Sequence, residues 1–530
     1  MERRSKQGVQ AITAVVLLLA ILLVVNLIST QIFGRVDLTE GKIYTLSKGS
    51  RELVRNLEDP LTIKAYFSEN LPAPYNNTAR FLRDQLDDYK AYSGGKLKYE
   101  FADPLSEEEL EKEAQGFQIP PVQVNAVEKD RLEVKKVYMG LVFLYQDRHE
   151  TIPLIQNTAG LEYDITSTIK RLTTTDRTSV GVLQGLGAPD MYQQMNQLGS
   201  VLERNYDIRP VDLSRNQLIP DDVDVLLIAG IEEEVDDWTM FAIDQFIMRG
   251  GKTAFLLNKV VTNLQEQKAQ KAPFRIDDWT KNYGFAINDD LVMDKSCGMV
   301  NMQQRMGFFT ISNPVNYPYF PIITSFSSSH PIAKDLENIT LFFPSTIDTT
   351  YAAGKELDIT PLFFTSEQCK LKKGSYAIDP KPQEDFSSYT EGPFVLGAAL
   401  EGAFTSYFEN REIPRGDTTL PQAAGLSILP SSPETRIVVV GEGNFAKDMF
   451  ASDPSNVAFL MNMVDWLAME EELIDIRTRD VTFRPLAEVS TGVKTTVKYA
   501  NIFAPPAIVI LIGLIRWQIR RRRKNVEFLV

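Results

Sequence analysis

The residues best placed to bind a ligand follow two short apolar runs, at 179–183 and 435–441, which we predict to be buried strands. Six residues in the polar turns after these runs make up a candidate ligand crevice: Gln184, Gly185, Gly187, Asp190, Glu442 and Asn444. In open α/β sheets, ligands bind at the carboxyl ends of parallel strands. We therefore expect both turns to face the same crevice.

Gly185 and Gly187 lie between a predicted strand and a predicted helix, as the glycines of phosphate-binding loops do. The turn has neither G-x-G-x-x-G nor G-K-[ST], and no lysine is near enough to act as a Walker lysine. A tight strand-to-helix turn accounts for both glycines. The sequence therefore predicts no nucleotide or other cofactor.

Catalytic and metal-binding patterns are not indicated either. The chain has no G-x-S-x-G elbow, and its two histidines, His149 and His330, stand far apart in predicted surface turns. Acidic pairs such as 236–237 and 289–290 are common in an acidic chain, so they do not identify a glycosidase dyad. No Cys or His cluster has the spacing of metal ligands. We expect no catalytic residue and no metal site.

Two cysteines, Cys297 and Cys369, are too few for a disulfide framework. They could form one bridge in an oxidising compartment or remain two buried thiols, and the sequence leaves both alternatives open.

The net charge of −14 is unevenly distributed along the chain. Without the nine basic and two acidic residues at its ends, totals of 56 basic and 70 acidic residues fall to 47 and 68, leaving about −21 on the interior. A strongly acidic body repels nucleic acid and anionic lipid. We expect no nucleic-acid partner.

Residues 48–175 alternate between strand and helix patterns in the order β-α-β-α-β-β-α, with prolines 120 and 121 before the third strand. This order predicts a thioredoxin-like fold. Because the region contains no cysteine, the redox chemistry of that fold is excluded. We interpret it as a binding or scaffold domain.

Residues 176–485 are predicted to form a second α/β domain with a doubly wound parallel sheet. Short apolar runs that alternate with helix patterns indicate a parallel sheet covered on both faces. The stretch from about 260 to 430 is rich in Pro, Ser, Thr and aromatic residues, and reads as an irregular or antiparallel insertion. The pattern resumes with the strand at 435–441.

Apolar segments at both ends predict two transmembrane helices, 9–33 and 499–519. A cleaved signal peptide is the alternative for the first, and a buried core helix for the second. A basic tail, 520–530, follows the second, and Arg516 could contact a membrane partner. By the positive-inside rule both termini are cytoplasmic and the body lies outside, in the periplasm of a Gram-negative cell. Two spans predict docking to other membrane helices at the bacterial inner membrane.

Several motifs together resemble those of the GldG-like auxiliary subunits, a family of gliding-motility and other ABC transport proteins. The matching stretches are Asp37-Leu38-Thr39, Tyr44-Thr45-Leu46-Ser47, Val180-Gly181-Val182-Leu183-Gln184-Gly185, Gly441-Glu442-Gly443-Asn444-Phe445 and Asn462-Met463-Val464-Asp465-Trp466-Leu467. The resemblance implies an extracytoplasmic subunit paired with an ABC-2-type permease and a separate cytoplasmic ATPase, and an α/β unit related to a domain of intraflagellar-transport proteins. Family members carry G-H-G-E after the first strand. This chain has Gly185-Leu186-Gly187-Ala188, so no role of that His or Glu transfers.

The sequence therefore predicts a non-enzymatic auxiliary subunit that docks to a permease and presents a large periplasmic body to a substrate or envelope protein. Two alternatives come from other classes. One is a membrane-tethered envelope enzyme acting on glycan at the crevice. The other is a structural adaptor of a gliding or secretion machine.

Overall fold

The computed structural model describes residues 45–477, except 129–130, 157, 159, 175–176, 216, 264–265, 274–275, 307–308, 335, 375, 382, 417–425, 451–452, 470–472 and 475. Towards the ends it describes 17–18, 21, 498–499, 501–503, 506 and 510–518. The chain divides into two compact units, Met1–Thr482 and Phe483–Val530. Within the first unit, an N-terminal lobe precedes residue 174 and a C-terminal lobe follows residue 178.

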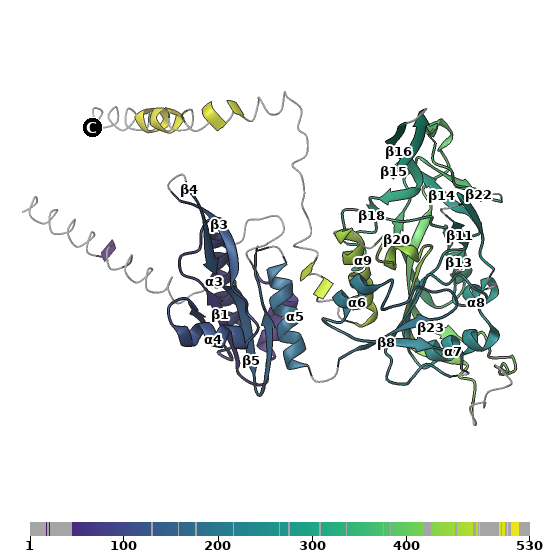
Figure 1. Ribbon diagram of the computed structural model, residues 1–530, viewed down its shortest axis with the longest axis horizontal. Coiled ribbons are helices and arrows are strands. Elements are labelled where there is room, and N and C mark those ends of the chain that lie inside the picture. The colour runs from purple at the N-terminus through teal and green to yellow at the C-terminus, as the bar shows by residue number, and fades with distance from the viewer. Residues whose placement is uncertain are drawn as a thin grey trace, which may run out of the picture. The chain divides into compact units, whose positions relative to one another are not determined.

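The N-terminal lobe is built on a four-stranded sheet in the order β2-β1-β5-β6 (Figure 1). Its strands are β1 (Leu61–Phe67), β2 (Leu97–Ala102), β5 (Met139–Tyr145) and β6 (Arg148–Ile152). Its helices are α2 (Lys48–Arg55), α3 (Tyr75–Tyr92), α4 (Glu108–Gly116) and α5 (Leu161–Thr173). β1 is parallel to β2 and antiparallel to β5, which is antiparallel to β6. Apolar side chains of α3 and α5 fill one core against the sheet, and α4 contributes to a second, smaller core.

The strand predicted after Pro120 and Pro121 does not join this sheet. It is β3 (Val122–Glu128), which pairs only with β4 (Arg131–Val137) as a separate hairpin. In β3 the valines Val122 and Val124 alternate with the polar residues Gln123 and Asn125, so the strand has one narrow apolar face. A central strand of a covered sheet needs apolar residues on both faces.

The C-terminal lobe contains an eight-stranded sheet in the order β17-β20-β23-β24-β10-β9-β7-β8. Its strands are β7 (Ser179–Gln184), β8 (Asp207–Asp212), β9 (Val225–Ala229), β10 (Lys252–Leu256), β17 (Ser325–Phe326), β20 (Leu357–Phe364), β23 (Val395–Thr405) and β24 (Ser431–Val440). The five strands from β24 to β8 are parallel, and β23, β20 and β17 are antiparallel. The sheet is thus mixed, which corrects the prediction of a doubly wound parallel sheet.

Helices cover both faces of this sheet. α6 (Asn196–Leu202) and α9 (Pro454–Leu467) share a core with Val438 and Val440, whereas α7 (Asp237–Met248) and α8 (Asp277–Asn282) share a core with Ile437 and Val439. Alternate residues of Ile437–Val440 at the end of β24 therefore enter opposite cores, which explains why this part of the strand is a continuous apolar run. In Figure 1, α7 and α9 lie beside different parts of the sheet.

The stretch 260–430 is largely antiparallel, as predicted. It is not a separate insertion, because three of its strands, β17, β20 and β23, are part of the eight-stranded sheet. Its other strands are β11 (Val260–Asn263), β12 (Lys268–Lys271), β13 (Ala286–Ile287), β14 (Leu291–Asp294), β15 (Cys297–Met306), β16 (Phe309–Ile323), β18 (Ile339–Thr340), β19 (Ile347–Asp348), β21 (Cys369–Lys372) and β22 (Tyr376–Ala377). Cys297 and Cys369 are free thiols. Burial raises the pKa of each to about 11, so both are protonated at neutral pH.

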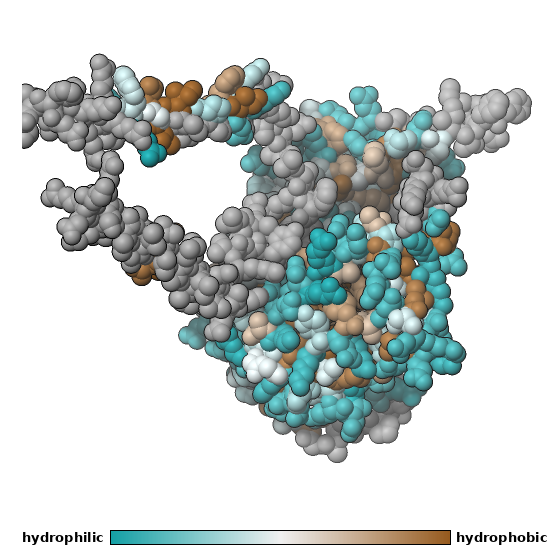
Figure 2. Space-filling view, turned by 90° about the vertical axis from the view of Figure 1, so that its left-hand side faces the viewer, coloured by the Kyte–Doolittle hydropathy of each residue, from teal (hydrophilic) through white to brown (hydrophobic). Residues whose placement is uncertain are grey.

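The predicted spans 9–33 and 499–519 lie mostly outside the described residues. Among the residues that are described, no helix is both long and apolar enough to cross a membrane. Residues 510–518 are helical, and they include large apolar side chains that are about half exposed or more: Ile510, Leu511, Ile512, Leu514 and Ile515. Figure 2 shows hydrophilic groups prevailing on the visible face of the first unit, with hydrophobic groups interspersed.

Candidate functional site

The turns that follow β9, β10 and β24 meet at one point of the C-terminal lobe. Gly230, after β9, donates its N–H to the carbonyl of Leu256 at 2.9 Å. A Cβ atom on Gly443, after β24, would lie 2.6 Å from the nitrogen of Gly230 and closer still to the oxygen of Leu256. Such distances exclude a side chain at position 443. Close backbone contact at the carboxyl ends of the strands is therefore the reason for this glycine.

The turn after β7 reaches the same point. A Cβ atom on Gly230 would lie 3.1 Å from Cδ of Pro189, and one on Gly187 would lie 3.0 Å from Cβ of Glu232. Gly185 and Gly187 have φ angles of +85° and +73°, which glycine adopts without strain. The predicted crevice residues are therefore brought to one edge of the sheet, and the glycines serve the tight turn that the sequence favoured.

The polar side chains of this edge bind their own loops. Oε1 of Gln184 accepts from the backbone N–H of Met191 at 3.2 Å, and Oδ1 of Asp190 accepts from those of Tyr192 and Gln193 at 2.9 Å. These bonds hold the loop that leads into α6. The amide of Gln184 and the carboxylate of Asp190 thus have structural roles in this state.

Glu442 is fully buried at the end of β24. Its carboxyl group accepts from the backbone N–H groups of Asn444 and Phe445, the second at 3.2 Å. Burial raises the pKa of Glu442 to about 8, although the backbone N–H groups of Asn444, Phe445 and Phe342 lower it. Glu442 therefore closes the turn that contains Asn444, itself half-buried.

An ion pair joins the loop after β24 to the loop after β9. Nζ of Lys447 lies 3.1 Å from Oε1 of Glu232, which follows β9. Asp448 accepts from the backbone N–H groups of Asn196 and Gln197, at 3.0 and 2.9 Å, and so caps α6. The segment after β24 thus fastens the neighbouring loops, and the edge is held together by its own polar groups.

A second polar cluster, which the sequence analysis missed, lies where the two lobes meet. We call it the arginine clasp, and it consists of Arg477, Asn462, Asp465, Tyr163, Tyr206 and Asn205. Arg477 donates to Oδ1 of Asn462, to Oδ2 of Asp465 and to the hydroxyl of Tyr163, each at 2.7 Å. Tyr206 donates to the other oxygen of Asp465. Asn205 donates to the hydroxyl of Tyr163 at 2.7 Å.

The clasp is a buried and well-partnered ion pair. Arg477 is 9% exposed and Asp465 is 0% exposed. Burial lowers the pKa of Arg477, but the charge of Asp465 and the hydroxyl of Tyr163 outweigh that effect and raise it overall. The guanidinium also lies 4.6 Å from the centre of the Tyr163 ring. Arg477 therefore stays charged and joins α5 of the N-terminal lobe to α9 of the C-terminal lobe.

One signal in the sequence could have found half of the clasp. Asn462 and Asp465 are spaced three residues apart in the part of α9 after Asn456, which is otherwise apolar, so they lie on the same face. They also belong to the stretch that resembles the auxiliary-subunit family. Polar residues on a buried helix face need partners. Nothing local identifies Arg477 or Tyr163 as those partners, because Tyr163 is 314 positions away from Arg477.

His330 corrects the prediction that both histidines lie on the surface. It is 7% exposed, and its ring packs 4.9 Å from that of Trp466 in α9. Burial, with a smaller effect from Arg436, lowers the pKa of His330 to about 4, so it is neutral at physiological pH. His149 is exposed, as predicted, but it lies on β6 rather than in the hairpin turn. Arg516, the predicted membrane-partner residue, is exposed on the helix at 510–518.

Comparisons with known proteins bear on this architecture. Residues 177–465 match the family described as "ABC-type uncharacterized transport system", and residues 40–144 match a domain of unknown function. A protein of Borreliella burgdorferi (strain ATCC 35210 / DSM 4680 / CIP 102532 / B31), described as "Uncharacterized protein", is 22% identical over 523 residues, which cover 94% of this chain and 95% of that protein. Among solved structures, the "mmIFT52 N-terminal domain" is 12% identical, with a TM-score of 0.33, and the match covers 55% of this chain and 97% of that one.

The first of these matches covers more than half of the chain. It runs from residue 177, just before β7, to Asp465 of the clasp, so it contains the parallel strands, the glycine turns and most of α9. It confirms the resemblance to the GldG-like auxiliary subunits that the motifs indicated. The chain belongs to the family of auxiliary components of ABC-type transport systems.

Proposed function

We propose that this chain is a non-enzymatic, membrane-anchored auxiliary subunit that docks to an ABC-2-type permease and, through it, to a cytoplasmic ATPase. The observation that carries the proposal is the family match over residues 177–465. The sequence has no Walker motif, which agrees with ATP hydrolysis by another polypeptide. The polar groups at the sheet edge are engaged in holding loops, which gives this edge a structural role.

The membrane arrangement is part of this proposal. Helices at 9–33 and 499–519 would span the bacterial inner membrane, with both termini in the cytoplasm and the body in the periplasm. Its support is the apolar sequence of both segments and the basic residues on their outer flanks. The exposed apolar side chains at 510–518 agree with a helix that contacts lipid or other membrane helices.

We further propose that the N-terminal lobe is a thioredoxin-like domain used for binding. Its support is the sheet order β2-β1-β5-β6, with one parallel and two antiparallel pairings. α3 and α5 share one core and α4 contributes to another, as that fold requires. The lobe has no cysteine, so we assign it to contact with a substrate or an envelope protein.

The clasp suggests how such a subunit could respond to its partner. Arg477 is the last described residue before the segment that leads to the predicted span at 499–519. Its side chain holds α9 and α5 together. A displacement of the C-terminal span would act on both lobes if it were passed along the chain to Arg477. In this proposal the clasp couples the membrane helices to the body.

Docking is tested by expressing two arginine variants of the full-length chain in the bacterium that naturally produces it. Arg516→Gln removes the charge at the end of the predicted span, and Arg523→Gln removes a charge of the tail and serves as the control. After solubilisation in mild detergent, we expect the permease to co-purify with the wild type and Arg523→Gln, and to be reduced with Arg516→Gln. Equal recovery in all three would contradict the role of Arg516. Absence of the permease from all three would contradict the docking proposal.

A further inference from the structure

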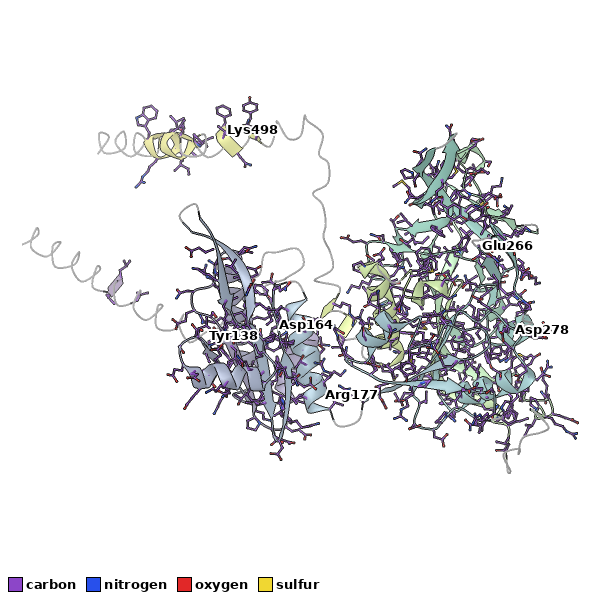
Figure 3. All side chains as sticks on the ribbon, viewed as in Figure 1. Tyr138, Asp164, Arg177, Glu266, Asp278 and Lys498 are labelled. Carbon is purple, nitrogen blue, oxygen red and sulfur yellow. The ribbon has the colours of Figure 1, made fainter. Side chains whose placement is uncertain are left out.

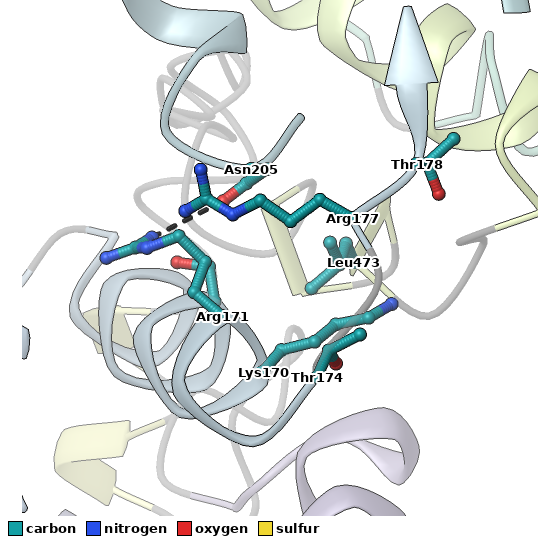
Figure 4. A pocket seen from close by; sticks show the side chains of 8 residues that line it. Lys170, Arg171, Thr174, Arg177, Thr178, Asn205 and Leu473 are labelled. Atoms are coloured by element: carbon teal, nitrogen blue, oxygen red, sulfur yellow. Dashed lines mark hydrogen bonds between the residues drawn. The ribbon is translucent and has the colours of Figure 1, made fainter. Parts of the chain in front are cut away.

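A small cavity of about 20 Å³ lies where the N-terminal lobe passes into the C-terminal lobe (Figure 4). It is lined by Ser167, Lys170, Arg171, Thr174, Arg177, Thr178, Asn205 and Leu473. About 10–15 Å³ suffices for one water molecule, so the space admits one or two oxygen atoms of a ligand rather than a whole organic molecule. All the lining side chains except Leu473 are polar.

The charge of this cavity is opposite to that of the protein. Lys170, Arg171 and Arg177 contribute three cations, and no lining residue is acidic, although the chain carries a net charge of −14. Cations in the last turn of α5 are favourable to the helix dipole, which accounts for Lys170 and Arg171. It does not account for Arg177, which lies beyond the helix. Figure 4 shows Arg177 extending from the start of β7 towards Arg171.

The charge of Arg171 is only partly balanced. Its side chain is 15% exposed, and its nearest carboxylate oxygen, Oε2 of Glu150, lies 3.5 Å away. Its other bonds go to neutral oxygens, of Thr168 at 3.0 Å and Asn205 at 3.4 Å. Burial lowers the pKa of Arg171, Glu150 opposes this, and the charge of Arg177 lowers the pKa further. A half-buried cation whose nearest carboxylate oxygen is 3.5 Å away, and which has a like-charged neighbour, is stabilised by an added anion.

One carboxylate near the cavity, that of Asp164, does not line it. Asp164 lies on α5, away from the start of β7 where Arg177 stands (Figure 3). Burial raises the pKa of Asp164, and the charges of Arg204 and Arg171 lower it, so this carboxylate attracts Arg171 from outside the cavity. Among the described residues, the guanidinium of Arg177 has no ion-pair partner. Its donors are therefore available to a ligand.

We propose that this cavity binds a phosphate group, either free or carried on a larger molecule that remains outside. Guanidinium groups bind phosphate oxygens through paired N–H donors. Ser167 of α5, Thr174 directly after it and Thr178 before β7 add hydroxyl groups to the lining, and hydroxyls also bind phosphate oxygens. The cavity admits one or two of the phosphate oxygens, so the rest of the phosphate and of any larger ligand lies at its mouth. This inference does not depend on the proposed transporter role.

A bound phosphate would link the two lobes. Arg171 belongs to α5, Arg177 to the connection into β7, and Asn205 to the turn before β8. Asn205 also donates to Tyr163 of the clasp. The anion would therefore strengthen the contact between lobes at a position next to the clasp. Ligand binding should raise the melting temperature of the whole first unit.

The test is a titration of the full-length protein in detergent, with inorganic phosphate and glycerol phosphate as probes and chloride added to keep ionic strength constant. Binding is measured by calorimetry and by the shift in melting temperature. Arg177→Gln removes a ligand-facing charge at an exposed position, and Arg215→Gln removes an exposed charge elsewhere in the same lobe. Thr174→Val removes a hydroxyl without changing the charge.

We expect saturable phosphate binding by the wild type and Arg215→Gln, with affinity reduced about tenfold or more in Arg177→Gln, since a charge-assisted bond contributes that much. Thr174→Val should weaken binding less. Tighter binding of glycerol phosphate identifies a phosphate carried on a headgroup, and equal or weaker binding identifies the free ion. No saturation by either probe, or undiminished affinity in Arg177→Gln, would overturn the proposal.

Discussion

Arg477 donates to Asp465 at 2.7 Å, and neither side chain is more than 10% exposed. Asp465 also accepts from Tyr206, and Arg477 also donates to Tyr163 and Asn462. Both carboxylate oxygens of Asp465 and both terminal nitrogens of Arg477 thus have partners, and such satisfaction is the condition under which a buried ion pair is tolerated. The same pair joins residues from α5, α9 and the end of the described body. Its loss should therefore affect both stability and the contact between lobes.

Replacement of Arg477 by Gln should lower the free energy of unfolding by about 3–5 kcal/mol, because it leaves the buried carboxylate of Asp465 without its countercharge. Lys112→Gln is the matched control, since it breaks the exposed pair Lys112–Glu108, whose side chains are 71% and 80% exposed. An exposed pair contributes no more than about 1 kcal/mol. Urea unfolding of both variants measures the difference. An equal loss of unfolding free energy in both variants would show that the clasp does not stabilise the fold more than an exposed ion pair does.

Gly443→Ala should destabilise the C-terminal lobe by about 1–3 kcal/mol, because the added methyl group enters occupied space between two strand ends. Its Cβ would lie 2.6 Å from the nitrogen of Gly230. Gly199→Ala in α6 is the control, since nothing lies within 4 Å of its Cβ position. That variant should gain about 0.5–1 kcal/mol from the higher helix propensity of alanine. Thermal unfolding compares the two, and a neutral Gly443→Ala would refute the close approach.

The stability conferred by Glu442 should fall as the pH rises. Its pKa is about 8 in the folded chain and 4.5 ordinarily, so the folded state binds the proton more tightly. The contribution is fully present below pH 4.5 and is lost as the pH rises through about 8. Glu442→Gln cannot titrate, so the wild type should lose its advantage over this variant across that window. Unfolding free energies measured across the window test this, and a constant difference would contradict it.

His330 should produce the opposite pH dependence. Its pKa is about 4 when folded and 6.5 ordinarily, so the unfolded chain takes up the proton first on acidification. Stability should therefore rise with pH from about 4 to 6.5 and be fully present above 6.5. His330→Phe should flatten this slope, and His149→Phe, at an exposed position, should leave it unchanged. Melting temperatures across the window distinguish the two variants, and equal slopes would rule out the burial effect.

The parallel core of the C-terminal lobe could be predicted because its strands carry a local signal. β7, β9, β10 and the last four residues of β24 are covered on both faces, so each contains a continuous apolar run. β20 carries no such signal, and in β23 the buried run Leu396–Leu400 consists mostly of small residues. β20 contains Pro361, next to an irregular register at Phe363, and proline argues against a central strand. In β23, Gly397 leaves the space that the Phe363 ring occupies. These pairings depend on distant residues.

The candidate sites show the same division between local and distant information. The glycine turns after β7 and β24 could be located because each directly follows an apolar strand. What their polar residues do could not be foreseen, because Glu442 and Gln184 bind backbone groups whose positions depend on the folded loops. The clasp could not be predicted because Tyr163 and Arg477, which it joins, are far apart in the sequence. The thioredoxin-like fold and the membrane spans remain proposals.

The most direct test of the auxiliary-subunit role is the composition of the complex that this chain forms in its own membrane. The full-length protein carries an affinity tag at one terminus, is extracted in mild detergent and is weighed by native mass spectrometry, with its partners identified from peptides. We predict a complex that contains an ABC-2-type permease and a separate ATPase in fixed proportion. Recovery of the chain alone, with neither protein attached, would contradict the account.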